Sequence, residues 1–598
     1  MIESAADHPR HPLGSRARVL LSSVFGPYAV DDGAGSRQIN PMELYHNQVT
    51  RVQQAYSLRT FQRSWGLMLI QVNLQAPCTL LDFPSEQRFV EEIKRNRYDV
   101  VGISSIQTNL IKVRKMCRLV RKHLPDATIV VGGHIANLPG LEKWCSLDHI
   151  VRGDGVRWMR DFLGEDASQP LKHPQVLANI GTRIMGVTLR DHPGDVAATL
   201  IPSAGCPMGC NFCSTSAMFG GKGKFIKFYD TGREIFDIMC QLEANLGVKA
   251  FFVMDENFLV DKKRALELLE LMQQHGKPWS LYLFSSANVL QKYTIEQLVA
   301  LGVCWVWMGL EGKDSQYKKL AGTDTLSLVH KLQSHGIRVL GSSIIGLEEH
   351  TPENIDAAIE HAVNHSTEFH QFMLYTPIPG TALFAEHERN GTLLKPSEIS
   401  IADIHGQLKF NFHHPHIKDG QETEFLLRAF HRDFEVNGPS VIRIVRTNLH
   451  AWKRYQHHPD ARIRARFAHE AANLPVKYAG VLWATRRAYQ HDQRLTREIS
   501  ELLSELHQQF GWKSRLAAPI AGRYLLHMLR REQARLAQGW TYEPPTFYET
   551  NELHGPESAI PVEGVAATSP PSRLKFSKDA PIRTAVGECA KESVATGG

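Results

Sequence analysis

The chain has 598 residues, 43% of them hydrophobic and 22% charged, which is the composition of a globular protein rather than a fibrous or wholly disordered one. No run of about 18 apolar residues occurs and the first residues lack the apolar core of a signal peptide, so we expect neither a spanning helix nor a secretory leader. The nine cysteines are odd in number and mostly scattered, which argues against a disulfide framework and for a cytoplasmic location.

The first part of the chain alternates short apolar runs with segments of helical spacing. Residues 109–125 place Leu110, Val113, Met116 and Val120 on one helical face. Strands are predicted at residues 18–25, 66–74, 98–106, 127–134 and 149–155. This alternation predicts an α/β domain with a doubly wound parallel sheet at residues 1–165, followed by a linker at 166–195.

A second alternation occupies residues 196–390. Its six predicted strands lie at residues 198–203, 250–255, 279–286, 303–311, 338–346 and 369–377. A complete eight-unit β/α barrel usually needs about 250 residues. The shorter segment therefore predicts a partial, open (β/α)6 barrel.

The last part of the chain loses the strand pattern. We expect an α-helical domain at residues 391–545 and a disordered tail at 546–598, where the sequence has no hydrophobic periodicity. Residues 421–540 carry 20 Lys and Arg against 11 Asp and Glu, a net charge of +9, while the whole chain carries +6. The basic helices could lie at a membrane surface or form a solvated cap over the barrel mouth. No nucleic acid is expected, because the charges are dispersed and no RNA-binding module is recognisable.

Three cysteines stand close together in the segment GCPMGCNFC, at residues 205–213. Cys206, Cys210 and Cys213 have the spacing C-x₃-C-x₂-C. Thiolates are the usual ligands of iron–sulfur clusters, and three of them on a cubane leave one iron open. A zinc knuckle would need a fourth Cys or His nearby, and none occurs at residues 214–239. The tight spacing also disfavours three incidental buried cysteines, so we expect a cluster.

This motif, placed directly after the first strand of a six-unit barrel, resembles that of the radical S-adenosylmethionine superfamily. The resemblance implies that Cys206, Cys210 and Cys213 hold a 4Fe–4S cluster whose open iron binds the amino and carboxylate groups of S-adenosylmethionine. Reductive cleavage then gives a 5′-deoxyadenosyl radical that abstracts a hydrogen atom. The resemblance also places the backbone of Phe212 against the adenine.

The same resemblance suggests cofactor-binding residues at the carboxyl ends of later strands. Asp255, Glu256 and Asn257, in MDENF, stand where the family places polar groups near the methionine amine, although the usual Gly-Gly-Glu is absent. Ser285, in SSAN, corresponds to a ribose contact, and Glu311, in GLEG, ends the fourth strand at the mouth. Ordinary loop capping is the alternative for each residue. No catalytic residue of the protein itself is identified.

Upstream, the segments YDVVGISSIQTN, PDATIVVGGHIA and IVRGDG resemble the cobalamin-binding domain that precedes the barrel in one subclass of the superfamily. The resemblance places five residues at the cofactor edge of the sheet: Ser104, Thr108, Gly132, Gly133 and His134. The Asp-x-His-x-x-Gly signature is absent, so no histidine of this domain is expected to be the lower axial ligand. The alternative is a domain that kept the fold and lost the cofactor.

These observations predict a radical S-adenosylmethionine enzyme that uses a 4Fe–4S cluster, S-adenosylmethionine and cobalamin. We expect methyl transfer to an unactivated carbon, or carbon–carbon bond formation, on a membrane lipid or isoprenoid. A soluble metabolite or peptide is the alternative substrate, and a non-catalytic redox or cobalamin sensor is the alternative of another class. The expected partners are an electron donor such as flavodoxin or ferredoxin and the surface of the inner membrane.

Overall fold

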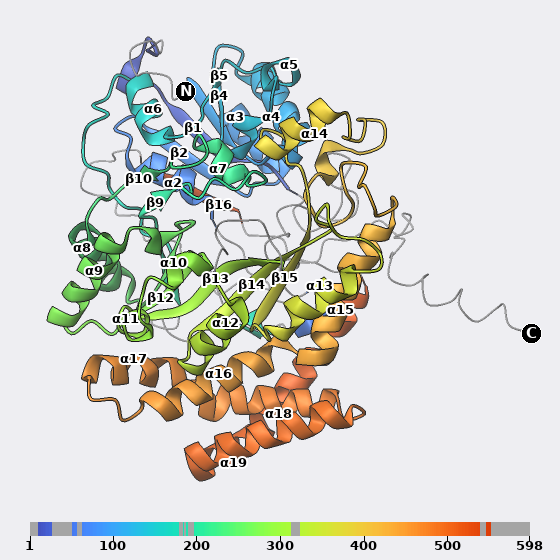
Figure 1. Cartoon of the computed structure of the whole chain (residues 1–598). Coiled ribbons are helices and arrows are strands. Elements are labelled where there is room, and N and C mark those ends of the chain that lie inside the picture. Colours follow the sequence, from blue (N-terminus) through green and yellow to red (C-terminus); the bar gives the residue numbers. More distant parts are fainter. Residues whose placement is uncertain are drawn as a thin grey trace, which may run out of the picture.

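The structure, a computed structural model, describes residues 10–26, 51–56, 63–178, 183–184, 187–188, 196–312, 323–538 and 546–551. Part of the predicted linker and residues 552–598 of the predicted tail therefore lie outside the described part. An N-terminal sheet, an open barrel and a helical domain follow one another along the chain, and the barrel lies between the other two (Figure 1).

The N-terminal sheet has the strand order β16-β2-β1-β3-β4-β5. Its parallel strands are β1 (Val19–Ser23), β2 (Cys78–Asp82), β3 (Val100–Ser104), β4 (Thr128–Gly132) and β5 (His149–Ile150). Helices α3 (Glu86–Arg95) and α4 (Leu110–His123) cover one face, and α2 (Trp65–Val72) and α6 (Gly155–Phe162) cover the other. The doubly wound fold is confirmed, and its order 2-1-3-4-5 leaves a crevice outside the carboxyl ends of β1 and β3.

One predicted strand of this domain is wrong. Residues 66–74 form mostly helix α2 rather than a strand, and the strand beside β1 is β2, which the sequence reading missed. Periodicity does not separate a short apolar run that is buried as helix from one buried as strand. Leu67, Met68 and Leu69 are all buried, and leucine and methionine favour helix.

The barrel sheet has six parallel strands in consecutive order, and all six predicted strands are confirmed. They are β8 (Ala197–Leu200), β11 (Ala250–Val253), β12 (Ser280–Ser285), β13 (Val303–Glu311), β14 (Arg338–Ile345) and β15 (Phe369–Leu374). The edge strands β8 and β15 do not pair with each other, so the barrel is open. Helices α8 (Gly232–Leu246), α9 (Lys262–Gln274), α11 (Ile295–Ala300), α12 (Thr325–Ser334) and α13 (Ile355–Asn364) belong to the β/α units.

The helical domain contains α15 (Gln421–Asn437), α16 (Ser440–Tyr455), α17 (Ala461–Ala471), α18 (Ala479–Ala488) and α19 (Gln493–Ala537). Helix α17 packs on the amino ends of the barrel strands. The Arg466 guanidinium donates to the carbonyl of Val303, the first residue of β13, over 2.8 Å, and Glu470 pairs with Arg338, the first residue of β14, over 3.1 Å. These helices therefore close the end opposite the strand carboxyl ends, and the interpretation as a cap over the mouth is wrong (Figure 1).

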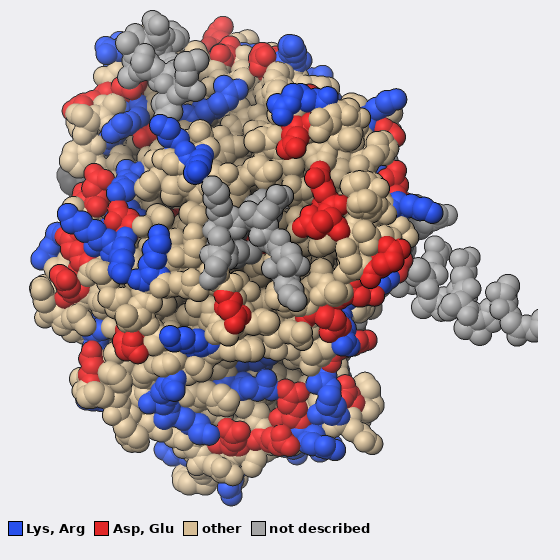
Figure 2. Space-filling model, in the orientation of Figure 1, with Lys and Arg blue, Asp and Glu red and all other residues tan. Residues whose placement is uncertain are grey.

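The charge of the helical domain is distributed rather than concentrated in one patch on the face shown in Figure 2, where Lys and Arg lie among Asp and Glu at the bottom of the view. Ion pairs between its helices contribute, such as Lys453 with Glu505 at 3.1 Å. Among the described helices, none has both the length and the apolar character needed to cross a bilayer.

The chain returns to the first sheet after the helical domain. Residues Phe547–Thr550 form strand β16, which pairs antiparallel with β2. Its position is supported by an ion pair between Arg63 and Glu549 at 2.9 Å and by contact of the Phe547 and Phe83 rings. The predicted disordered tail from residue 546 is therefore wrong for this segment, because a strand of four residues adds to an exposed sheet edge without needing a hydrophobic period of its own.

Candidate functional site

The three-cysteine loop lies at the carboxyl end of the barrel sheet. It runs from β9 (Ser203–Ala204) to α7 (Ser214–Met218), and the Cys213 thiol caps that helix by accepting from the Ser216 amide at 3.5 Å. All three cysteines are partly exposed and none is in a disulfide. Burial is the main cause that raises the pKa of Cys206 to about 11, and the neighbouring thiols Cys213 and Cys210 contribute to this rise, so the three groups are close enough to interact electrostatically.

The two glycines of the loop are required by its packing. Gly205 and Gly209 have φ of 93° and 73°. A Cβ at Gly209 would lie 2.5 Å from the Lys222 Cβ, and one at Gly205 would lie 2.8 Å from the Phe219 ring. The loop can therefore fold tightly against residues 219–222 only with glycine at both positions.

The three thiols are compatible with the ligands of a cluster. Among the residues that the structure describes, no group of three His, Cys, Asp or Glu side chains is placed to hold a single metal ion. In a cubane each thiolate binds a different iron, so the ligands surround the cluster instead of converging. The donor set of three thiolates is the one that such a cluster takes.

Asp255 and Glu256, adjacent at the end of β11, have different environments. The Asp255 carboxylate pairs with Arg264 at 3.0 Å, with the two side chains only 4% and 1% exposed, and it also accepts from the Ser203 hydroxyl. Its charge is therefore committed to a structural pair. The structure makes it a support for the loop rather than a free carboxylate at the mouth.

Glu256 points to the cysteine loop. One of its carboxylate oxygens accepts from the Gly205 amide at 2.9 Å. Burial, with the charge of Asp255 as the second cause, raises its pKa to about 7. Within the described part of the chain, Glu256 forms no ion pair with Lys or Arg, so a ligand ammonium group would complete this site.

The remaining predicted contacts lie at neighbouring strand ends. The Asn257 amide donates to Ser286 at 3.1 Å and accepts from the Ser285 hydroxyl at 3.2 Å, which joins the ends of β11 and β12. Glu311, the last residue of β13, is 6% exposed and has a left-handed φ of 50°, a strained conformation for this residue type. Phe212 packs beside the apolar cluster at the ends of β14 and β15.

The predicted cobalamin edge lies at the carboxyl ends of β3 and β4, where Ser104 and Gly132 are the last residues. Gly133 has φ of 79°, and a Cβ there would lie 2.6 Å from the Ser105 carbonyl oxygen. This glycine is therefore required by the packing of its own loop. At Gly132, by contrast, the nearest atom to an added Cβ would be 3.8 Å away, which is an ordinary contact distance.

Several buried polar atoms beside this edge have no hydrogen-bond partner among the residues that the structure describes. They are Ser105 Oγ, Thr108 Oγ1, Asn109 Nδ2, Asn137 Nδ2 and Asn211 Oδ1. They come from the loop after β3, from the 3₁₀ helices η3 (Gln107–Asn109) and η4 (His134–Asn137), and from the cysteine loop. Buried polar groups are rarely left unsatisfied, so such a group of them indicates a polar ligand. A corrin ring, whose rim carries amide groups, fits these donors and acceptors.

The crevice of the first domain faces the barrel mouth. The His134 Nε2 lies 3.1 Å from the Thr215 hydroxyl on α7, and burial lowers the pKa of His134 to about 4. A Cβ at Gly380, after β15, would lie 2.4 Å from the Asn137 carbonyl oxygen. The two predicted cofactor sites therefore share one interface, which no local sequence pattern indicated.

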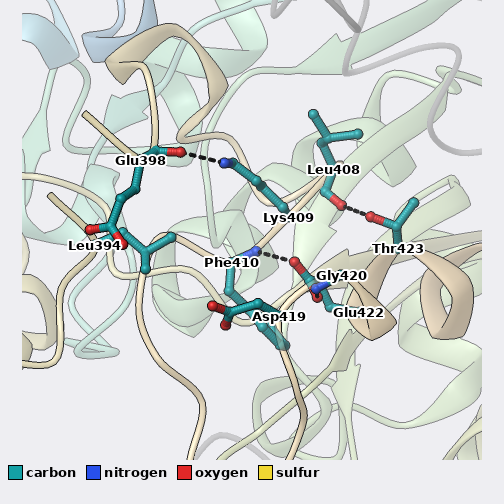
Figure 3. Close-up of a pocket in the computed structure, with 9 residues that line it drawn as sticks. All are labelled: Leu394, Glu398, Leu408, Lys409, Phe410, Asp419, Gly420, Glu422 and Thr423. Carbon is teal, nitrogen blue, oxygen red and sulfur yellow. Dashed lines mark hydrogen bonds between the residues drawn. The ribbon is translucent and has the colours of Figure 1, made fainter. Parts of the chain in front are cut away.

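A cavity of about 320 Å³ lies elsewhere, within residues 394–423, which are mostly irregular rather than helical as expected (Figure 3). Its nine lining residues include none of the predicted cofactor residues. The Lys409 ammonium is held on the Glu398 carbonyl oxygen at 2.7 Å. This cavity is separate from the candidate site.

The aromatic residues on the inner face of the barrel were not among the predicted site residues. On β13, Trp305 and Trp307 are partly exposed, whereas Cys304, Val306 and Met308 are buried. The alternation of exposure shows that the tryptophans face the barrel interior. The sequence does indicate this face: in VCWVWMGLE the two tryptophans are two residues apart, so both lie on the same side of a strand.

The doubly wound domain, the open barrel and the three-cysteine loop between them define a radical S-adenosylmethionine enzyme with a cobalamin-type domain. Residues 65–163 match the family model of the B12 binding domain, and residues 200–362 match that of the radical SAM superfamily. The chain belongs to this superfamily, in the subclass with an N-terminal B12-binding domain. Its cofactors are a 4Fe–4S cluster, S-adenosylmethionine and cobalamin.

Curated relatives include an uncharacterized methyltransferase of Pyrococcus horikoshii, 22% identical over 56% of this chain and 79% of the relative. The hopanoid C-2 methylase of Rhodopseudomonas palustris is 25% identical over 56% of this chain and 69% of that protein. The bacteriochlorophyllide d C-12(1)-methyltransferase of Chlorobaculum tepidum is 30% identical over 31% of this chain and 42% of that protein. Among solved structures, the methyltransferase TsrM from Kitasatospora setae is 15% identical, with a TM-score of 0.48 over 76% of this chain and 99% of that chain.

Proposed function

We propose that this enzyme methylates an unactivated carbon of an apolar substrate, an isoprenoid or fatty-acyl lipid, held inside the barrel. The observation that carries this proposal is the aromatic inner face of the sheet. Phe284 on β12 stacks on Trp307 of β13 with ring centroids 5.1 Å apart, and Phe252 of β11 meets Phe284 edge-on at 5.8 Å. Three neighbouring strands thus form one aromatic wall, made of Phe252, Phe284 and Trp307.

The polar atom of this wall, the indole nitrogen of Trp307, already has a hydrogen-bond partner within the protein. The Trp307 indole N–H donates to the Ser342 hydroxyl at 2.8 Å, and that hydroxyl donates to Gln371 at 3.1 Å. The wall therefore offers apolar ring faces to a substrate, which supports a hydrocarbon better than a charged metabolite.

Each group of residues then has a role. When bound, the cluster with S-adenosylmethionine supplies hydrogen-atom abstraction, and cobalamin supplies the methyl group. Cys206, Cys210 and Cys213 hold the cluster, and Glu256 orients the ammonium group of S-adenosylmethionine. The orphan polar atoms of η3 and η4 seat the corrin, and the aromatic wall excludes water from the acceptor carbon.

An electron carrier such as a flavodoxin or ferredoxin completes the system, acting in the cytoplasm. Lys222 and Lys224 are exposed in the segment that packs against the cysteine loop. Their charge would favour an acidic carrier close to the cluster.

The test is lipid mass spectrometry of the host with and without this gene, followed by turnover of the anaerobically reconstituted enzyme on the lipid found. We expect loss of a lipid that is one methylene heavier than its precursor. Trp307→Ala should lower methylated product about tenfold while cleavage of S-adenosylmethionine continues. Trp144→Ala, at a residue 52% exposed on the first domain, is the matched control. An unchanged lipid profile, with the gene expressed, would favour a soluble metabolite or peptide.

A further inference from the structure

Helix α19 carries a row of exposed apolar side chains beyond its break at Gly511, where φ is 69° and ψ is −154°. Trp512, Leu516, Ile520 and Tyr524 are 68%, 60%, 70% and 58% exposed. They recur every four residues, which places them on one side of the helix. We name these four residues the outer stripe.

The opposite side of the same segment is packed, so the direction of the outer stripe is set by the fold. Ala518, Leu525 and Leu529 are buried in the core of the helical domain. Helix α18 approaches closely, since a Cβ at Gly522 would lie 2.5 Å from the Trp483 ring. The stripe is therefore held outward on a rigid support, at the edge of the molecule remote from the first sheet (Figure 1).

The exposed charges of this segment of helix α19 are all basic. Residues 512–537 contain six Lys and Arg, and Lys513, Arg523, Arg530 and Arg531 are exposed. The single acidic residue of this segment, Glu532, is 2% exposed and lies 3.9 Å from Arg535. An apolar row on a helical segment whose exposed charges are basic is complementary to an anionic lipid surface.

We propose that the outer stripe docks this enzyme on the surface of an anionic bilayer, lying in its interface without crossing it. Four-residue steps drift by roughly 40° each, so the stripe spreads over about 120° of the helix, wider than the narrow seam of a coiled coil. A broad apolar face suits a plane better than a second helix, and the long basic side chains can reach the headgroups. Because the helical domain closes the amino end of the barrel, this surface is an anchor and is independent of the substrate.

The test uses the full chain and vesicles of phosphatidylcholine with or without phosphatidylglycerol, read by co-sedimentation. We expect binding to the anionic vesicles only, weakened by salt. Trp512→Ser with Ile520→Ser should weaken binding at least about tenfold. Lys513→Gln with Arg531→Gln should weaken it about 30-fold, from about 1 kcal/mol for each basic residue.

Trp144→Ser is the matched control, since it removes an exposed tryptophan, 52% exposed, from the first domain. It should bind vesicles as the unchanged chain does, and circular dichroism should show all variants folded. Absence of binding to anionic vesicles would overturn the proposal. So would a dimer in solution that the Trp512→Ser and Ile520→Ser changes dissociate, because the stripe would then be covered by a second copy. Neither result depends on turnover, so the proposed function is tested separately.

Discussion

The imidazole of His134, at the cobalamin edge of the first domain, lies 3.1 Å from the hydroxyl of Thr215, two residues beyond the last cysteine of the cluster motif. The two residues are 81 positions apart in the chain. With its pKa lowered to about 4 by burial, His134 is neutral at physiological pH and has one ring nitrogen to donate and one to accept. This contact links the crevice of the first domain to helix α7, which directly follows the cysteine loop.

Loss of this contact should affect the alignment of the two sites more than the occupancy of either. For Thr215→Val we expect normal cluster and cobalamin spectra, with product formed per S-adenosylmethionine cleaved lowered about tenfold, because small displacements of reacting groups are costly. Thr215→Ser keeps the hydroxyl and should behave as the unchanged enzyme. An unaltered ratio in Thr215→Val would show that the contact is only structural.

The cysteine motif gives a second prediction. Cys210→Ala should lose the visible absorbance of the 4Fe–4S cluster and the reductive cleavage of S-adenosylmethionine, since two remaining thiolates cannot hold the cluster with its open iron. Cys240→Ala, in helix α8 and outside the motif, should retain both properties. Cleavage that persists in Cys210→Ala would contradict the assignment of the cluster ligands.

Asp255 and Glu256, adjacent at the end of β11, should differ in what changes when the charge is removed: ligand binding for Glu256 and stability for Asp255. Glu256→Gln should weaken binding of S-adenosylmethionine at least about tenfold, because a charge-assisted hydrogen bond contributes about 1.5–3 kcal/mol, and should leave thermal unfolding nearly unchanged. Calorimetric titration of the reconstituted enzyme measures the first effect.

Asp255→Asn is the counterpart. It leaves Arg264, 1% exposed, without its anionic partner, and breaking a buried pair costs about 3–5 kcal/mol. We therefore expect a lower unfolding midpoint as the main effect. If Asp255→Asn is stable but binds S-adenosylmethionine poorly, and Glu256→Gln is unstable, then Asp255 is the binding residue and Glu256 the structural one.

The attachment of the helical domain to the barrel depends on Glu470. This side chain is 11% exposed and accepts from Arg338 at 3.1 Å and from Arg466 at 2.8 Å. Glu470→Gln should lower the free energy of unfolding by about 3 kcal/mol in urea titrations. Glu505→Gln removes a more exposed ion pair with Lys453 and should cost less than about 1 kcal/mol. Equal effects of the two changes would count against the buried pair as the main attachment.

Buried histidines should make the protein sensitive to acid. Burial lowers the pKa of His370 to about 3 and those of His134, His365 and His405 to about 4, from an ordinary value of 6.5. Between about pH 6.5 and 4 the unfolded chain binds protons at these positions that the folded chain does not, so stability decreases as the pH falls through this window. Each unit of difference in pKa corresponds to about 1.4 kcal/mol.

Thermal unfolding measured from pH 7.5 to 4.5 tests this expectation. His370→Gln should make the decrease less steep, whereas the same change at the exposed His457 should not. A decrease as steep in His370→Gln as in the unchanged chain would contradict it.

The sequence by itself determined the elements whose signals are local. The six barrel strands are short apolar runs bounded by turns, and the cysteine motif acts through its own spacing, so both could be predicted. The prediction of a strand at residues 66–74 was wrong because a buried apolar run of that length is compatible with helix or strand. Only packing on β1 and β2 decides between them.

Only the tertiary structure decided which distant side chains meet. It paired Asp255 with Arg264 and placed Glu256 against the Gly205 amide of the cysteine loop, although the two carboxylates are neighbours in the sequence. It also placed the basic helices on the amino end of the barrel and the crevice of the first domain over its mouth. The physical reason is that burial and pairing depend on contacts between segments far apart in the chain, whereas composition and spacing report only the local preference of each segment.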